Sequence, residues 1–267
     1  MRSLIRTLLI GSIVGYSLVC LMLFIMQEKF VFIPDKLSQD YQFSFPGNYE
    51  EVRFVSEGNI LSALHFRTSQ PKGVVLYFHG NAGSLRTWGE IAPIFTRRNY
   101  DLFIMDYRGY GKSTGQLNRE ADFHTDARAA YDYLRQQYDA QQIILFGRSL
   151  GTGVASRLAA DVPARMLILE TPYVSLGEIV ASRMPFIPTT RLFKYPLDTY
   201  TWIGQVGYPI YIFHGTADNT VPYAHSQRLL PFIQATHELI TLPGGGHGDL
   251  ATFEGYRSKI SAILAQP

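Results

Sequence analysis

The sequence predicts an α/β protein in which a mostly parallel, twisted sheet of about eight strands is covered by helices on both faces. Three observations predict it. Short apolar runs alternate with segments of helical length from residue 49 onward. Polar residues that could do chemistry lie just past the ends of several runs. The 267 residues, of which 46% are hydrophobic, are enough for one large domain with a substantial core.

The first element of the chain is an apolar segment. Thr7 to Met26 are twenty residues without a charge. As a helix rising about 1.5 Å per residue they would span about 30 Å, the thickness of a bilayer's hydrocarbon core. The alternative is a cleaved signal peptide, but its apolar region is usually about 7–15 residues long and ends in small residues. Because residues 21–26 are bulky throughout, we expect residues 1–27 to be an uncleaved transmembrane anchor.

The charges that flank this segment indicate its orientation. Arg2 and Arg6 precede it, and Lys29 and Lys36 follow it. This bias favours a cytoplasmic N-terminus, with the main domain on the non-cytoplasmic side. Residues 28–48 are expected to form an extended connector. Its aromatic residues either pack on the body or lie at the membrane interface, and they are Phe30, Phe32, Tyr41, Phe43 and Phe45.

Residues 49–267 are expected to form one domain of alternating strands and helices. The expected strands are Glu51–Val55 and Ile60–Phe66 (a hairpin around Glu57-Gly58-Asn59), Gly73–Phe78, Leu102–Met105, 142–147, Met166–Leu169, Ile210–Phe213 and Leu239–Leu242. Helices are expected after Ser84 and at about 120–137, 150–160, 223–234 and 249–265.

Candidate functional residues follow the ends of these strands. In a parallel sheet covered by helices, ligands bind beyond the carboxyl ends of the strands. The residues expected at that edge are Asn81, Asp106, Ser149, Glu170, Asp218 and His247. Their shared position is stronger evidence for a site than any one motif.

The most informative motif is Gly-Arg-Ser-Leu-Gly at 147–151. It follows an apolar strand and precedes a helix that begins with small residues, which predicts a strand, a very tight turn and a helix. A serine on such a turn has a strained backbone and an exposed hydroxyl group. The motif also occurs by chance, because glycine and serine are common. A catalytic Ser149 therefore needs a base, an acid and oxyanion donors from elsewhere in the chain.

His247 is the strongest candidate for the base. It lies in a Gly-Gly-Gly-His-Gly loop after the last strand, where packing does not explain a histidine. The order Ser, Asp or Glu, His along the chain is typical of a nucleophile on a strand-to-helix turn. Core, loop-bracing or surface roles are expected for the other histidines, which are His65, His79, His124, His214, His225 and His237.

Asp218 and Glu170 compete for the role of the acid that orients the base. Both follow strands, and both fit the order along the chain. Asp218 is favoured because its strand should neighbour the strand that delivers His247, so that a short loop could reach the imidazole. Glu170 is expected to brace the site or the insertion at 172–206, and Asp106 to hold the loop that follows it by hydrogen bonds.

The developing oxyanion requires two backbone N–H donors. The first is expected from Leu150, directly after the serine, where the helix also directs its N-terminal N–H groups. The second is expected from Asn81, in the loop after strand 73–78. The alternative for His79-Gly80-Asn81 is an ordinary turn.

Together these motifs resemble the α/β-hydrolase superfamily along almost all of residues 50–265. The segments that carry the resemblance to its membrane-anchored branch are His-Gly-Asn-Ala-Gly (79–83), Asp-Tyr-Arg-Gly-Tyr-Gly-Lys-Ser (106–113), Gly-Arg-Ser-Leu-Gly (147–151), Gly-Thr-Ala-Asp (215–218) and Gly-His-Gly (246–248). That branch includes protein depalmitoylases and many bacterial members. The resemblance implies a serine-hydrolase triad of Ser149, Asp218 and His247, with no metal or cofactor. It leaves the substrate open among esters, thioesters, lipids and peptides.

Residues 172–206 interrupt the alternation with many apolar side chains and several prolines. By position they are expected to form a short lid over the site, and the alternative is ordinary packing. With the anchor, this segment favours an apolar or acyl-chain substrate. Arg183, Arg191 and Lys194 could meet lipid headgroups or be solvated.

Composition excludes other classes of function. The net charge is +2, and both excess positive charges lie in residues 1–27, which gives no basis for nucleic-acid binding. The single cysteine, Cys20, cannot form an internal disulfide, and no zinc-ligand spacing is present. The end of a P-loop is suggested by residues 109–113, but the first glycine of that motif would fall at Asp106.

Three hypotheses about the function remain open. The favoured one is a membrane-anchored serine hydrolase that cleaves carboxylic ester or thioester bonds of a small or lipid-like substrate. The others are a serine peptidase of the same fold and a catalytically silent, membrane-tethered binding module.

Overall fold

The computed structural model describes residues 2–266, with all of their side chains except those of residues 190 and 191. Its main feature is an eight-stranded sheet in the order β10-β9-β8-β7-β4-β6-β3-β2. The strands are β2 (Asn48–Ser56), β3 (Asn59–Arg67), β4 (Gly73–Phe78), β6 (Tyr100–Met105), β7 (Ile143–Arg148), β8 (Met166–Glu170), β9 (Ile210–Gly215) and β10 (His237–Leu242). Strand β3 is antiparallel to β2 and β6, and the other neighbouring pairs are parallel. The mostly parallel sheet predicted from the sequence is confirmed.

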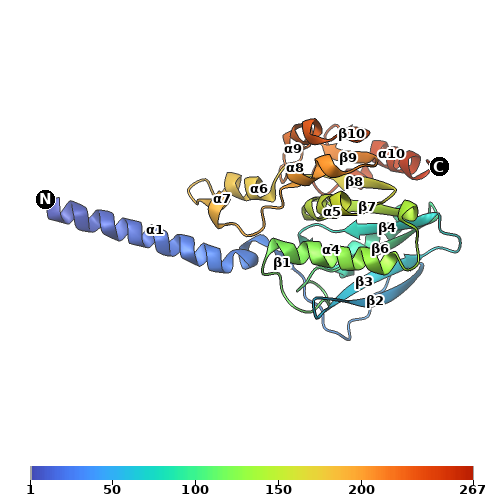
Figure 1. The fold of residues 1–267 in the computed structure, drawn as a ribbon, viewed down its shortest axis with the longest axis horizontal. Helices are drawn as coiled ribbons and strands as arrows, with labels where there is room; N and C mark the ends of the chain where they lie inside the picture. Colours follow the sequence, from blue (N-terminus) through green and yellow to red (C-terminus); the bar gives the residue numbers. More distant parts are fainter. Residues whose placement is uncertain (1, 267) are drawn as a thin grey trace.

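Helices cover both faces of this sheet (Figure 1). The helices of the whole described chain are α1 (Arg2–Val31), α2 (Leu85–Trp88), α3 (Ala92–Thr96), α4 (Glu120–Leu134), α5 (Leu150–Asp161), α6 (Leu176–Arg183), α7 (Thr189–Leu192), α8 (Thr199–Trp202), α9 (Ala224–Leu229) and α10 (Glu254–Leu264). Helices α4, α5 and α8 pack over one face, and α2, α3 and α10 over the other.

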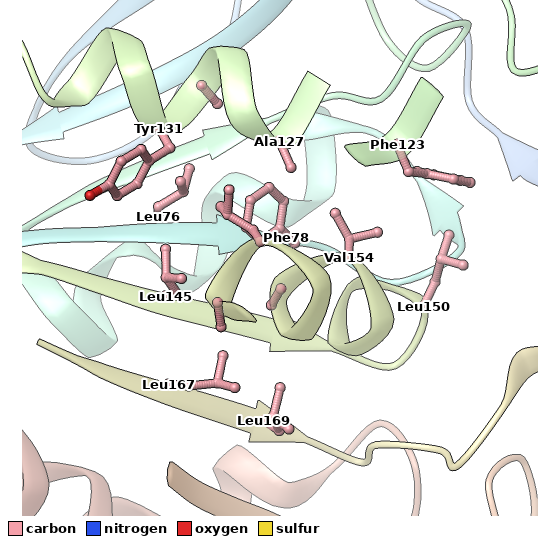
Figure 2. Packing of buried hydrophobic residues seen from close by; sticks show 14 of the residues in the cluster. Leu76, Phe78, Phe123, Ala127, Tyr131, Leu145, Leu150, Val154, Leu167 and Leu169 are labelled. Carbon is pink, nitrogen blue, oxygen red and sulfur yellow. The ribbon is translucent and has the colours of Figure 1, made fainter. Parts of the chain in front are cut away.

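The buried strands β4 and β7 supply side chains to both cores. Leu76 and Phe78 of β4 pack against Val154 of α5 in the first core (Figure 2). Because successive residues of a strand point to opposite faces, Tyr77 of the same strand packs in the second core with Phe95 of α3. A continuous apolar strand is therefore required. In the register of β4 with β7, Phe78 lies beside Gly147, so the ends of the two strands lie together.

Helix α1 extends away from the body (Figure 1). It is long and apolar enough to cross a membrane, as a signal sequence would also be, and no residue of its most apolar stretch is buried. The sequence predicts that an extended connector begins at residue 28, but the helix continues to Val31. The physical reason is that the side chains of Gln27 and Glu28 are bound by the segment around Lys194, so this last turn is held by contacts that no local pattern reveals.

After the helix, the connector packs on the body. Its short strand β1 (Ile33–Pro34) pairs with β5 (Ala82–Gly83). Phe32 is buried in the first core, and Phe43 and Phe45 pack against the second. The sequence left open whether the aromatic residues of the connector pack on the body or lie at the membrane interface. These three pack on the body.

Three predicted helices begin or end at different residues. The helix expected at about 120–137 is α4, which ends at Leu134. Helix α9 ends at Leu229 and is followed by a 3₁₀ turn at Leu230–Phe232, because Pro231 lacks the N–H that a continuing α-helix needs. The last helix begins at Glu254, after a 3₁₀ turn at Leu250–Thr252. None of these differences changes the order of elements.

The buried His65 makes the stability of the domain depend on pH. Its ring lies 3.2 Å from the Tyr138 hydroxyl and within 4 Å of Asp101 and Glu50. Burial, reinforced by the charge of Arg67, lowers the pKa of His65 to about 3. The folded protein thus keeps this ring neutral where the unfolded chain, with a pKa of about 6.5, binds a proton. This contribution is complete above the unfolded pKa and is lost as pH falls toward the folded one.

We therefore expect the free energy of unfolding to fall by about 2–3 kcal/mol between pH 7 and about pH 4.5 through this group. In His65→Phe, which keeps a ring in the core but cannot titrate, that part of the decrease should be missing. Urea unfolding at the two pH values measures the difference. Parallel pH profiles for the two proteins would contradict the assignment.

Candidate active site

Ser149 lies on a sharp turn between β7 and α5. Its backbone has φ 50° and ψ −117°, a strained conformation for a residue with a side chain. The flanking glycines make the turn possible, since a Cβ on Gly151 would lie 2.0 Å from the carbonyl oxygen of Phe78 and one on Gly147 would lie 2.4 Å from that of Gly151. The predicted strand, tight turn and helix are present, with the hydroxyl at the carboxyl edge of the sheet.

The side chains of Ser149, His247 and Asp218 form one hydrogen-bonded chain. His247 Nε2 lies 2.9 Å from Ser149 Oγ. Its other ring nitrogen, Nδ1, lies 2.7 Å from Asp218 Oδ2. These distances and this order match the geometry in which a histidine takes a serine proton while a carboxylate orients the ring.

Two adjacent strands deliver the acid and the base. Strands β9 and β10 are parallel neighbours, and Asp218 and His247 follow their ends. The Oδ1 atom of Asp218 accepts the N–H groups of Thr220 and Val221, each at 2.8 Å. The carboxylate is therefore held in one orientation with Oδ2 directed at the imidazole.

The electrostatics of this pocket keep Asp218 ionised. Burial alone would raise its pKa, but hydrogen bonds from His214 and His247 outweigh it and hold the pKa of the carboxyl well below its usual range. His214 is fully buried and also contacts the Ser226 hydroxyl and the Val221 carbonyl. The sequence predicted a bracing role for this histidine, and its contacts are of that kind.

Glu170 lies beneath the turn rather than beside the base. Its carboxylate pairs with Arg148 Nε at 3.0 Å and accepts the Tyr256 hydroxyl at 2.8 Å. Its backbone carbonyl accepts the N–H of Ser149 at 2.9 Å. Arg148 also donates to the carbonyl of His247 at 3.4 Å. The pair thus connects the serine turn with the histidine loop, a position that suits bracing and not orientation of the ring.

Asn81 and Leu150 border the same pocket as Ser149. A Cβ on Gly80 would lie 3.7 Å from that of Ser149, so the loop after β4 runs directly beside the hydroxyl. Asn81 is fixed on both sides, since its side-chain amide donates to the carbonyl of Val31 at 2.6 Å and its own carbonyl accepts the Tyr110 hydroxyl at 2.9 Å. The two residues expected to supply the N–H donors therefore border the site.

Asp106 takes no part in this arrangement. It is fully buried, accepts the N–H of Leu85 at the start of α2, and lies 3.5 Å from His79. Burial raises its pKa above the usual value, despite the opposing effect of His79. The predicted hydrogen bond to the following loop is made by its backbone, since the Ser113 hydroxyl donates to the Asp106 carbonyl at 2.8 Å. The carboxylate itself accepts the N–H of Leu85 and lies against His79 and Gly111.

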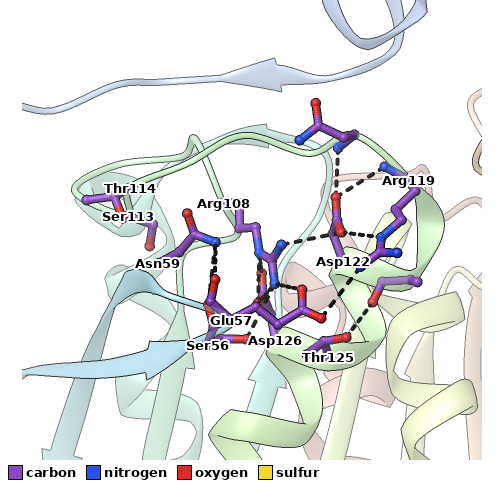
Figure 3. A network of polar contacts seen from close by, with 12 residues as sticks. Ser56, Glu57, Asn59, Arg108, Ser113, Thr114, Arg119, Asp122, Thr125 and Asp126 are labelled. Carbon is purple, nitrogen blue, oxygen red and sulfur yellow. Dashed lines mark hydrogen bonds and ion pairs between the residues drawn. The ribbon is translucent and has the colours of Figure 1, made fainter.

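The loop at 106–113 is held by structural polar contacts. Figure 3 shows the Arg108 guanidinium between three carboxylates, with Asp126 at 2.8 Å, Glu57 at 3.0 Å and Asp122 at 3.3 Å. Lys112, the lysine of the partial P-loop pattern, is buried and pairs with Glu51 at 2.8 Å. Arg108 and Lys112 are thus engaged in structural ion pairs. This agrees with the conclusion from the sequence that residues 109–113 are not a phosphate-binding loop.

A pocket opens over Ser149. Its walls combine residues from the end of α1, the loop after β4, the serine turn with the start of α5, the loop after β9 and the β8–β9 connection (residues 171–209). The lining residues are Val31, Asn81, Ser149, Leu150, Tyr173, Leu176, Ile179, Arg183, Thr220 and Val221. Among residues 2–266, no group of three or more His, Cys, Asp or Glu side chains is arranged to hold a metal ion.

Relatives of this chain share most of its length. Uncharacterized protein Rv2307c of Mycobacterium tuberculosis is 33% identical over 222 residues, which cover 82% of this chain and 78% of that protein. Alpha/beta hydrolase domain-containing protein 17B of Homo sapiens is 28% identical over 219 residues, covering 79% and 73% of the two chains. A family model described as "Serine aminopeptidase, S33" matches residues 69–195. The chain belongs to the α/β-hydrolase superfamily.

Solved structures agree with this α/β-hydrolase in fold. The Pyrococcus furiosus esterase Pf2001 superimposes with a TM-score of 0.70 at 18% identity, covering 88% of this chain and 97% of that one. Est1E of Butyrivibrio proteoclasticus, bound to ferulic acid, gives a TM-score of 0.65 at 19% identity, covering 80% and 96%. The predicted resemblance is therefore confirmed at the level of the superfamily.

Several residues of this α/β-hydrolase site were not predicted from the sequence. Val31 at the end of α1, Tyr173 and Ile179 line the pocket, and Tyr110 holds Asn81. Val31, Tyr173 and Ile179 belong to no motif with a chemical signature, and the 106–113 motif that contains Tyr110 does not indicate a contact with Asn81. The sequence did contain one signal for the bracing pair. Arg148 is a charged residue inside the serine motif at the end of a buried strand, where an unpaired charge would be costly, and its partner is Glu170.

Proposed function

We propose that the chain is a membrane-anchored serine hydrolase that cleaves carboxylic ester or thioester bonds. The observation that carries the proposal is the hydrogen-bonded chain from Ser149 through His247 to Asp218, with distances of 2.9 and 2.7 Å. Membership of the α/β-hydrolase superfamily supports a hydrolytic enzyme in general. The reaction class follows from the chemistry that such a chain of groups can perform.

In the proposed mechanism, His247 Nε2 takes the proton of Ser149 Oγ as this oxygen attacks the carbonyl carbon. The oxyanion that forms is held by the N–H groups of Asn81 and Leu150. His247 then gives its proton to the departing alcohol or thiol, which leaves an acyl group on Ser149. Water, deprotonated by the same imidazole, attacks the acyl-enzyme and releases the acid. Asp218 keeps the ring in the required tautomer throughout.

The composition of the pocket favours an ester over a peptide substrate. An aminopeptidase must recognise the positive α-amino group of its substrate, which requires carboxylates at the site. The described lining residues contain no carboxylate, and their one charged side chain is Arg183. Apolar side chains such as Leu176 and Ile179 dominate the wall instead, which suits an acyl group.

Helix α1 supports the proposed anchoring. By length and composition it can cross a bilayer, and the positive charges before it favour a cytoplasmic N-terminus with the domain on the other side. In this reading the β8–β9 connection acts as the lid expected from the sequence. Its Arg183 donates to the carbonyl of Thr220 and Lys194 pairs with Glu28, whereas the side chain of Arg191 lies outside the described residues.

A fluorophosphonate probe tests the nucleophile directly. The wild type should be labelled, and Ser149→Ala should lose the label, because the probe reacts only with an activated serine. Ser258→Ala, at an exposed serine of α10, is the matched control and should be labelled like the wild type. Equal labelling of Ser149→Ala would overturn the assignment. Absence of labelling in the wild type, together with no turnover of any p-nitrophenyl ester, would favour the catalytically silent binding module.

A further inference from the structure

The β8–β9 connection is fastened to the base of α1. Gln27, which is 6% exposed, accepts the N–H of Lys194 at 2.8 Å and donates to the carbonyl of Leu192 at 3.2 Å. Glu28 accepts the Lys194 ammonium and the Tyr195 hydroxyl, each at 2.9 Å. Figure 1 shows α6 and α7 projecting from the body on the side from which α1 leaves it. The helix and the connection are therefore joined where both leave the domain.

The two segments also touch far from the body. The Tyr16 hydroxyl donates to the carbonyl of Phe186 at 2.8 Å. Tyr16 precedes Met26, the end of the uncharged segment, by ten residues, which is about 15 Å along a helix. The tip of the connection, residues 184–188, thus lies beside the middle of the segment that would cross a bilayer, and not at its edge.

The amino-acid composition of the tip, residues 184–188, suits a position in the middle of a bilayer. It reads Met-Pro-Phe-Ile-Pro, and Phe186 is 86% exposed to solvent. Irregular backbone is tolerated in a membrane only where its polar groups are paired. Here the two prolines have no N–H, Ile187 donates to the carbonyl of Met184 at 3.0 Å, and Tyr16 satisfies the carbonyl of Phe186.

A partly open apolar pocket lies between the helix and the connection. Its walls include Leu23, Phe24 and Val31 from α1, and Met184, Ile187 and Leu192 from the connection. Val31 is also a wall of the pocket over Ser149, so the two spaces adjoin at this residue. A peptide would leave its own N–H and C=O groups unpaired in such surroundings, whereas a hydrocarbon chain has none to pair.

We propose that α1 and the tip enter the bilayer together, and that the pocket between them holds the acyl chain of a long-chain ester or thioester lying in that leaflet. The carbonyl carbon of this substrate would then reach Ser149 past Val31. The inference rests on the proposed function and names the substrate class of the same site. It means that substrate enters from the membrane and not from the surrounding water.

Chain-length selectivity tests the pocket in full-length protein reconstituted in phosphatidylcholine vesicles. Leu23→Trp fills the pocket, and we expect it to lower the ratio of kcat/KM for p-nitrophenyl palmitate to kcat/KM for p-nitrophenyl butyrate by at least about tenfold. Leu21→Trp makes the same change on an exposed face of α1 outside the pocket and should keep the wild-type ratio. An unchanged ratio in Leu23→Trp, or an equal fall in Leu21→Trp, would overturn the proposal.

The insertion of the tip has its own measurement. In a Cys20→Ser background, an environment-sensitive fluorophore on Phe186→Cys should shift to the blue and be quenched by lipids that carry a quencher in their acyl chains. The same fluorophore on Ser69→Cys, in the exposed loop before β4, should do neither. Identical, water-like signals at both positions would contradict insertion.

Failure of this proposal is distinguishable from failure of the proposed function. A wild type that hydrolyses butyrate but no long-chain ester in vesicles would retain the serine-hydrolase assignment and overturn the acyl pocket. A wild type that hydrolyses neither would overturn both. Where p-nitrophenyl palmitate is hydrolysed, release of palmitate from an S-palmitoyl peptide, or from the phospholipid itself, would support the proposal further and would identify the group to which the natural acyl chain is attached.

Discussion

Ser149→Ala and His247→Ala should each lower kcat for a p-nitrophenyl ester by about 10⁴- to 10⁶-fold, and the double variant should lose no more than either single one. The reason is that the two side chains perform one step. The oxygen of Ser149 is a poor nucleophile unless the imidazole 2.9 Å away takes its proton, and the imidazole has nothing to deprotonate when the hydroxyl is gone. Losses that multiplied would show that the two residues act separately.

Steady-state kinetics on the four proteins measure this, with thermal unfolding as the control for folding. Ser149 and His247 are joined to each other and to Asp218 by side-chain bonds at the edge of the sheet, so neither replacement opens a cavity in a core. The melting temperatures should therefore stay close to that of the wild type. Residual activity in Ser149→Ala comparable with the wild type would move the nucleophile elsewhere.

The parts of the site that could be predicted are those that obey local rules. A buried parallel strand reads as an unbroken apolar run, and the residue that follows it must lie at the carboxyl edge of the sheet. This is why Ser149, Asp218 and His247 could be named from sequence, and why the geometry brings them together. The choice of Asp218 over Glu170 also followed from strand order, since β9 and β10 are neighbours.

The parts that could not be predicted depend on contacts between distant segments. Val31 enters the pocket only because α1 continues past its apolar stretch, and that last turn is held by Lys194 and Leu192 from the other half of the chain. Likewise, nothing in the local pattern around Tyr16 indicates that its hydroxyl meets Phe186, 170 residues away. Such pairs have no periodicity, because their spacing is set by the fold and not by an element.

Asp218→Asn should lower kcat by about 10²- to 10⁴-fold, and the surroundings of Asp218 explain the mechanism. Its Oδ1 accepts two backbone N–H groups, from Thr220 and Val221. An asparagine would place its single carbonyl oxygen there, and its NH₂ group would then face His247 Nδ1. That nitrogen would have to accept a hydrogen bond, so the proton would move to Nε2. A protonated Nε2 cannot take the proton of Ser149.

Glu170→Gln is the matched comparison, because it makes the same chemical change in the competing carboxylate. Glu170 pairs with Arg148 and Tyr256 and makes no bond to the imidazole. We expect kcat to change by less than about tenfold, while the free energy of unfolding falls by about 1–3 kcal/mol as a buried charge-assisted bond weakens. Kinetics and urea unfolding of both variants separate the two roles. If Glu170→Gln lost activity by the larger factor and Asp218→Asn did not, the orienting acid would be Glu170.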